Sequence, residues 1–267
     1  MNLKKNFLIS VCCGICGIAF ADDAQNQTQS DLAQKIQITK NACSGISEQM
    51  NDMKKLAGIN TAITGVGTVA GTTGLIAGAG ANYLGSLDES NYDYSEKVLN
   101  QAKTISLGAT AATDTVGTII AAKNHIDDDL QTHIDKCVAA INDMHNERLR
   151  ARGEENSNPS ELAQAEVIER MCYDWKVIDL SKIDKRATGA AISGGTGAAL
   201  AVAGAITTAG IDEETDYKDK EKQHKASNTL AGGASVASGV ATIFNAAQIS
   251  AIKKAVAIAD KCEEALK

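Results

Sequence analysis

The feature that most constrains this chain is a long uncharged run, residues 59–87, in which small residues recur at regular steps. The small residues are Gly67, Gly71, Gly74, Gly78, Ala81 and Gly85, separated by three or four positions. An α-helix turns by about 100° per residue, so this spacing places them on one narrow face. Each glycine costs about 1 kcal/mol of helix propensity relative to alanine. The run therefore predicts a helix whose glycine face packs closely against another helix.

The second half of the chain repeats the first. One constant offset carries Cys43 onto Cys172 and the segment AITG at 62–65 onto AISG at 191–194. A slightly shorter offset carries Cys137 onto Cys262. An offset that changes only across a turn is typical of a duplicated helical hairpin. The glycines of the second copy that we predict to pack between helices are Gly194, Gly195, Gly204, Gly233 and Gly239.

These patterns predict an all-α protein of two tandem antiparallel helical hairpins, arranged like a four-helix bundle. Residues 30–147 form the first hairpin and residues 160–267 the second. Residues 148–159, which are charged and carry the single proline, form the linker. Turns are predicted at 88–95 and 212–223, where acidic and polar residues gather.

Residues 1–21 have the pattern of a secretory signal peptide: two lysines, an apolar stretch and the small-x-small end Ala19-Phe20-Ala21. Cys12, Cys13 and Cys16 lie in this stretch without the pattern of a lipoprotein signal. Residues 22–29 read as a flexible leader. We therefore expect export to the periplasm, to an envelope membrane or to the outside of the cell.

Export would place the four remaining cysteines in an oxidising compartment, where disulfides persist. The midpoint of Cys43 and Cys137 falls in the first predicted turn, and that of Cys172 and Cys262 in the second. Each pair should therefore lie level across its own hairpin. We predict these two disulfides, with pairing between the repeats as the alternative.

Charge is almost absent from one layer of the predicted fold. Residues 59–87, 187–211 and 226–252 contain no charged residue, and residues 104–122 contain only Asp114. Soluble bundles keep charges on their outer faces, so something should cover this layer. If lipid covers it, the protein associates with or inserts into a membrane as an anchor or pore, and Asp114 is an intramembrane polar candidate. If copies of the chain cover it, the protein is a soluble periplasmic or secreted structural or interaction protein that assembles through the same faces.

Several functions are not expected. The formal net charge of −7 and the lack of a basic run argue against nucleic-acid binding. The segment GVGTVA at 65–70 fits a dinucleotide pattern but lies inside a predicted helix, and no phosphate loop, HExxH or GxSxG motif occurs. We therefore expect no enzyme activity and no cofactor, and no residues carry a specific resemblance to a known family.

His125, Asp129 and His133 are weak candidates for metal ligands, because steps of four would align them on one helical face with Cys137. The second copy does not repeat them. We interpret them as a solvated polar flank and predict no metal site.

Overall fold

The computed structural model describes residues 30–87, 93–155, 157–211 and 217–267, and every regular element within these ranges is a helix. The all-α prediction is confirmed. The predicted signal peptide and leader lie outside the described residues, as do parts of both predicted turns. The elements are α1 (Asp31–Cys43), α2 (Ile46–Gly85), α3 (Asp93–Lys123), α4 (Asp128–Ala151), α5 (Pro159–Cys172), the 3-10 helix η2 (Tyr173–Lys176), α6 (Ser181–Ala209) and α7 (Tyr217–Ala265).

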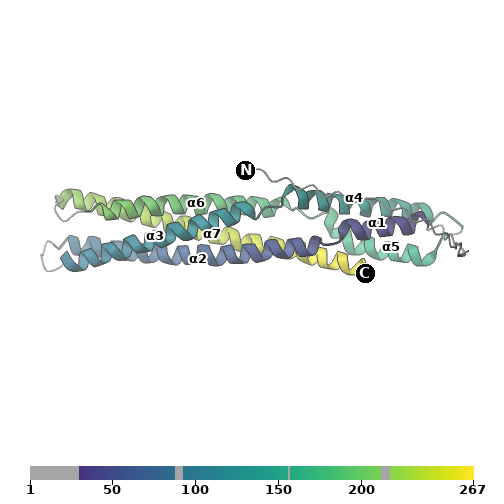
Figure 1. The fold of residues 1–267 in the computed structure, drawn as a ribbon, viewed down its shortest axis with the longest axis horizontal. Helices are drawn as coiled ribbons and strands as arrows, with labels where there is room; N and C mark the ends of the chain where they lie inside the picture. Colours follow the sequence, from purple (N-terminus) through teal and green to yellow (C-terminus); the bar gives the residue numbers. More distant parts are fainter. Residues whose placement is uncertain (1–29, 88–92, 156, 212–216) are drawn as a thin grey trace, which may run out of the picture.

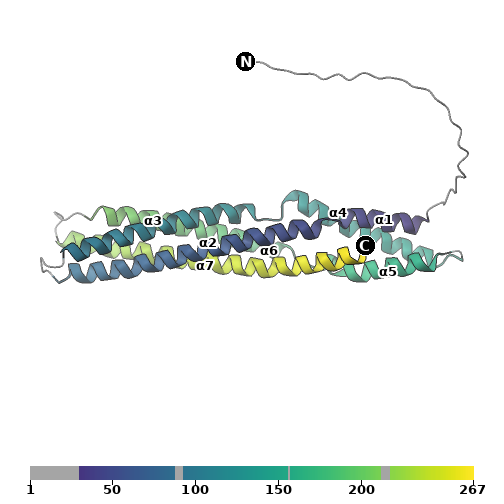
Figure 2. The ribbon, with the colours of Figure 1, turned by 60° about the horizontal axis from the view of Figure 1, so that its bottom comes forward.

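The helices form two bundles placed end to end along one axis (Figure 1). In the long bundle, α2 packs against α3 and the first part of α7, and α6 packs against the same two helices. In the shorter bundle, which we call the base, α1 packs on α4, α4 on α5, and α5 on the last part of α7. Figure 2 shows the same two groups from another side, with α7 extending from the long bundle into the near part of the base.

The helices are less continuous than the sequence indicates, and this corrects the prediction of one unbroken helix on each side of a hairpin. Three of the four break where the bundles meet, and only α7 continues. Between α1 and α2, Gly45 adopts a left-handed conformation with φ of 82°, which glycine reaches without steric cost. Between α3 and α4, Asp127 caps the new helix by accepting from the Leu130 amide, at 2.7 Å.

The repeated halves share one plan, although their breaks differ. Cys43 is the last residue of α1 and Cys172 is the last residue of α5. A helix of the long bundle follows each of them, directly after Gly45 in the first half and after η2 in the second. The linker is shorter than predicted, because α4 extends to Ala151 and Pro159 is already in the first turn of α5.

The core of the base has the apolar composition that is usual in water-soluble helical bundles. Its fully buried side chains are large and apolar and include Ile141, Met144 and Ile168, and the first turns of α2 add Ile46 and Met50 to the same core. Ion pairs lie on its surface, for example between Arg150 and Asp31 and between Arg152 and Glu166. Hydrophobic burial of this kind is the usual source of stability for a water-soluble bundle.

Candidate functional site

The long bundle has the opposite distribution of side chains. Its large apolar residues point outward, with Val69 69% exposed and Ile105 72% exposed. No charged side chain is contributed to this apolar surface by residues 59–87, 187–211 or 226–252. Other outward-facing members are Ile59, Val66, Ile76, Val116, Ile119, Ile192, Val202, Ile206, Val236 and Ile243. An apolar surface of this extent is unusual for a monomer in water and marks contact with lipid or protein.

The interior of the long bundle is built from small and polar residues. Alanines and glycines fill most of it, and polar side chains are buried among them. We call this series of buried polar residues, together with the partly buried Glu96 and Asn228, the polar column; from the hairpin tips toward the base, its members are Glu96, His224, Lys103, Asn228, Thr110, Asp114, Ser238, Thr64, Asn60, Asn245, Gln248 and Asn124. Buried polar groups need hydrogen-bond partners, so the hydrogen bonds of the polar column define the candidate site.

Asp114 lies fully buried at the centre of the long bundle and meets all four helices. Ser238 of α7 donates a hydrogen bond to one carboxylate oxygen, Oδ2. The other oxygen, Oδ1, has no hydrogen-bond partner among the described residues. A Cβ added at Gly67 of α2 would lie 2.7 Å from Oδ1, and one at Gly197 of α6 would collide with Oδ2. These two glycines therefore make room for the carboxylate.

Lys103 is the second buried charge, nearer the tips. Its ammonium group donates to the side-chain oxygen of Asn228, whose amide donates in turn to the carbonyl of Gly78 at 3.2 Å. A Cβ at Gly78 would lie 2.8 Å from the lysine Nζ. Closer still to the tips, His224 Nε2 lies 2.9 Å from a carboxylate oxygen of Glu96, and both side chains are largely buried.

Amides continue the polar column toward the base. Asn60 of α2 donates to Asn245 of α7 at 2.9 Å, and Asn245 donates to the Thr64 hydroxyl at 3.3 Å. Gln248 donates to the carbonyl of Asn124 at 2.8 Å, at the end of α3. Several oxygens of this series make no hydrogen bond within the described chain, including Asn60 Oδ1 and Gln248 Oε1.

An apolar layer interrupts the polar column between Lys103 and Asp114. Leu107 fills its centre together with four alanines, Ala111, Ala201, Ala231 and Ala234. Leu107 is fully buried and extends between glycines of two helices, because a Cβ at Gly204 would lie 3.1 Å from its Cδ1 and one at Gly74 3.6 Å from its Cγ. It is one of the few large apolar side chains that point into this bundle.

Most of the predicted glycines lie at close helix contacts. A Cβ at Gly71 would lie 3.2 Å from the Ser235 Cα, and one at Gly194 would lie 2.8 Å from the Thr118 hydroxyl. Gly85 approaches the Glu96 carboxylate and Gly233 approaches Leu200. Two predicted positions are only loosely packed, since a Cβ at Gly195 or Gly239 would make contacts of 3.8–3.9 Å.

Sequence reasoning missed three tightly packed glycines. A Cβ at Gly117 would lie 2.6 Å from the Thr64 methyl, one at Gly189 would lie 2.9 Å from the Phe244 ring, and Gly197 faces Asp114. Gly197 follows Gly194 by three positions, so continuing the glycine stripe into the second copy would have found it.

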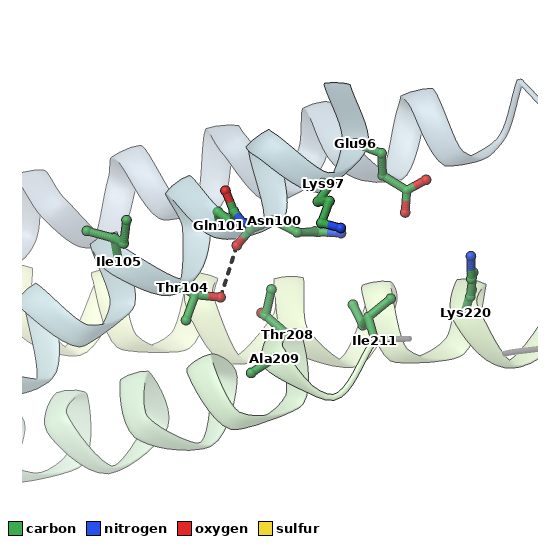
Figure 3. A pocket seen from close by; sticks show the side chains of 10 residues that line it. All are labelled: Glu96, Lys97, Asn100, Gln101, Thr104, Ile105, Thr208, Ala209, Ile211 and Lys220. Atoms are coloured by element: carbon green, nitrogen blue, oxygen red, sulfur yellow. Dashed lines mark hydrogen bonds between the residues drawn. The ribbon is translucent and has the colours of Figure 1, made fainter. Parts of the chain in front are cut away.

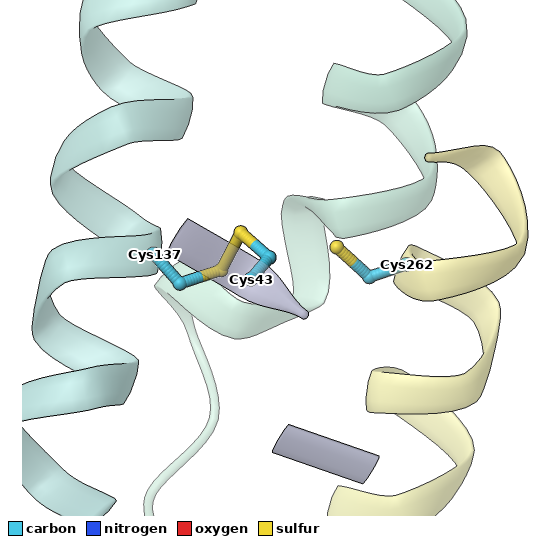
Figure 4. Close-up of side chains that lie close together, drawn as sticks. All are labelled: Cys43, Cys137 and Cys262. Carbon is cyan, nitrogen blue, oxygen red and sulfur yellow. A yellow bond between two sulfur atoms is a disulfide. The ribbon is translucent and has the colours of Figure 1, made fainter. Parts of the chain in front are cut away.

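The four cysteines lie together in the core of the base. Cys43 is bonded to Cys137, with Cα atoms 4.7 Å apart, and Cys172 to Cys262, with Cα atoms 4.5 Å apart. These are the pairs expected from the spacing. The two bonds are neighbours, because the Sγ atoms of Cys43, Cys137 and Cys262 lie within 4.8 Å of one another (Figure 4).

The weak metal candidates His125, Asp129 and His133 line one cavity near the base, but their ligand atoms are not among those that the described structure brings within 4.8 Å of one another. His125 lies in the break before α4, so the helical spacing that would align it with Asp129 and His133 does not apply. The only cluster of three or more metal-ligating side chains found in the described ranges is the cysteine group. His125 instead lies 4.0 Å from the carboxylate of Asp184.

A cavity opens at each end of the polar column. The one near the tips has a volume of about 670 Å³ and is lined by residues that include Glu96, Asn100, Thr104 and Thr208 (Figure 3). The one near the base has a volume of about 630 Å³, and Asn124 lies in its wall. The polar column thus begins and ends at open space.

Four helical stretches of the described chain are long and apolar enough to cross a membrane, judged by length and composition. They are Asp31–Gly85, Tyr94–Ala151, Pro159–Ala209 and Asp219–Ala265, with mean hydropathy of 1.3–1.5 in their most apolar windows.

Comparison of the chain with known protein families, curated proteins and solved structures found no match.

Proposed function

We propose that the protein is exported and inserts its long bundle into an envelope or target membrane, where it acts without enzymatic chemistry as an anchor or pore. The observation that carries this proposal is the distribution of side chains in the long bundle. Valine and isoleucine face outward, while Asp114, Lys103 and several amides face inward. In water, the outward-facing valines and isoleucines would gain no stabilisation from the hydrophobic effect. In a membrane, they would contact lipid, while the charged and amide side chains would lie inside the bundle, away from lipid.

The margins of the long bundle support the same proposal. Exposed lysines gather where the long bundle meets the base, at Lys55, Lys123, Lys182, Lys185, Lys253 and Lys254. Exposed tyrosines, Tyr83 and Tyr94, lie near the opposite end. Basic residues suit anionic headgroups, and tyrosine favours the interface between lipid and water. About 20 helical residues cross a hydrocarbon core roughly 30 Å thick, so the uncharged runs are long enough.

The base would remain in water on an oxidising side of the membrane. Its core is apolar, its surface carries ion pairs, and its two disulfides persist only where reducing systems do not reach them. In the long bundle, glycine contacts and interhelical hydrogen bonds would supply the association energy that the hydrophobic effect cannot supply between helices in lipid.

Alkaline carbonate extraction of membranes from cells expressing the full-length chain tests the proposal. We expect the mature chain to stay in the membrane pellet after extraction. Release of the whole population into the supernatant would contradict insertion. It would favour the alternative, a soluble structural or interaction protein whose apolar faces are covered by further copies. Sedimentation of the released protein would then show an oligomer.

A further inference from the structure

The buried charges of the long bundle have no role in anchoring, because an anchor needs only an apolar exterior. A charged side chain is costly inside a bilayer, so such residues generally mark a path for ions or protons. Asp114 and Lys103 both point into the bundle from α3, roughly 16 Å apart along the helix at 1.5 Å per residue.

We propose that the polar column is a proton pathway across the membrane, with Asp114 as its proton-binding site and Leu107 as its gate. This inference rests on the proposed insertion of the long bundle. A proton would enter from one end cavity, bind the Asp114 carboxylate, and leave toward the other cavity. Each step moves one proton between neighbouring oxygen or nitrogen atoms, so no oxidant or reductant takes part.

The identity of the permeant follows from the packing around Asp114. The carboxylate is enclosed so tightly that a methyl group at Gly67 would lie 2.7 Å from Oδ1, and one at Gly197 would lie still closer to Oδ2. No hydrated metal ion fits between these helices without separating them. A proton needs only hydrogen-bonding groups, and these lie on both sides of the apolar layer at Leu107.

No charged group of another helix compensates Asp114. Its neighbours from α2, α6 and α7 are Gly67, Gly197 and Ser238, and the runs 59–87, 187–211 and 226–252 contain no Asp, Glu, His, Lys or Arg. Asp114 Oδ1 also lacks a hydrogen-bond partner in the described structure. The free oxygen gives an arriving proton a place to bind.

Leu107 and the surrounding alanines are the barrier. They form the one apolar layer between the two buried charges, and an apolar constriction blocks conduction because water cannot fill it stably. Leu107→Ser should open the path by replacing an isobutyl group with a hydroxyl. Val116→Ser, on the same helix but outward-facing and 46% exposed, is the matched control.

The test uses purified full-length protein in liposomes that contain a pH-sensitive dye, with a pH gradient and with valinomycin to balance charge. Co-flotation of protein with the liposomes is measured first. We expect wild-type protein and Val116→Ser to conduct slowly. Leu107→Ser should conduct about tenfold faster or more, since each 1.4 kcal/mol removed from a barrier is about a tenfold change in rate. Adding Asp114→Asn to Leu107→Ser should abolish the gain.

The outcomes are distinguishable. Protein that does not float with liposomes overturns the proposed insertion and this inference with it. Protein that floats but gives no proton flux in any variant overturns only the pathway and leaves the polar residues as interhelical contacts. Equal flux in Leu107→Ser with and without Asp114→Asn overturns the role of Asp114. Release of a small trapped dye by Leu107→Ser shows an open aqueous pore instead.

Discussion

The base and the long bundle belong to one chain and share α7, yet their interiors are opposites. In the base, isoleucine and methionine are buried and ion pairs lie outside. In the long bundle, glycine, alanine and polar groups are buried, and valine and isoleucine lie outside. Under the proposed insertion, the same helical hairpin folds in two solvents. What differs is which face of each helix carries the large apolar side chains.

The contacts that hold the helices together also differ between the base and the long bundle. The base has short helices held by two disulfides, whereas the long bundle depends on close backbone approach at glycines. The breaks at Gly45, before Asp127 and after Cys172 lie at the border between the two regions. They interrupt three of the four helical paths where the apolar core of the base gives way to the small and polar interior of the long bundle.

The largest expected effect is on the base. Replacing Cys172 and Cys262 together by alanine opens a loop with a sequence separation of 90 residues. The chain-entropy account then predicts a loss of about 4–5 kcal/mol in the free energy of unfolding of the base. Limited trypsin digestion of membrane-bound protein should cut the base faster and leave the uncharged segments of the long bundle protected. Equal cleavage throughout would show that the two regions do not unfold separately.

A matched pair of substitutions tests the outer surfaces. Val69 of the long bundle is 69% exposed and Val177 of the base is 63% exposed. Val69→Lys should oppose insertion by about 2.5–3.5 kcal/mol, because lysine is costly near the middle of a bilayer. Val177→Lys should change membrane retention little. Carbonate extraction measures both, and equal retention of the two variants would remove the contrast between the regions.

A smaller effect is expected at the glycine contacts. Gly71→Ala would place Cβ 3.2 Å from the Ser235 Cα, so α2 and α7 must separate, at a cost of about 1–3 kcal/mol typical of overpacking. Gly65→Ala meets nothing within 4 Å and should instead gain up to about 1 kcal/mol of helix propensity. Thermal unfolding in detergent should therefore move in opposite directions for the two variants. A shift of the same sign in both would show that Gly71 is not an interface.

The smallest effect concerns pH and the base. Burial opposes ionisation of Glu169, but His145 at 2.8 Å and Arg148 at 2.8 Å outweigh it, so the pKa of Glu169 lies below its ordinary value. The ionised carboxylate therefore stabilises the base above pH 4.5, and this contribution is lost as the pH falls through the lowered pKa. Partly exposed pairs contribute up to about 1 kcal/mol. Glu169→Gln should flatten the acid side of the stability curve measured by denaturant unfolding, and an unchanged curve would contradict this account.

The sequence alone contains the uncharged layer, and it predicted the helical class, the duplication and the preferred cysteine pairs. These follow from local quantities: the periodicity of small residues, the absence of charge and the positions of cysteines relative to turns. Gly67, Gly71 and Gly74 were predicted at contacts because a helix of fixed pitch puts residues three and four apart on one face. The breaks were not predicted, because a single glycine such as Gly45 is compatible with both a helix and a turn.

Only the tertiary structure decided what the glycine faces enclose. The sequence could place Asp114 on a helix but not state whether it pointed to solvent, to lipid or to the bundle axis. Its burial depends on Gly67, Gly197 and Ser238, which come from three other helices and meet only when both hairpins pack. The same holds for Lys103 with Asn228. Pairwise contacts between distant segments depend on the rotation of each helix about its axis, which local spacing leaves undetermined when small residues occupy more than one face.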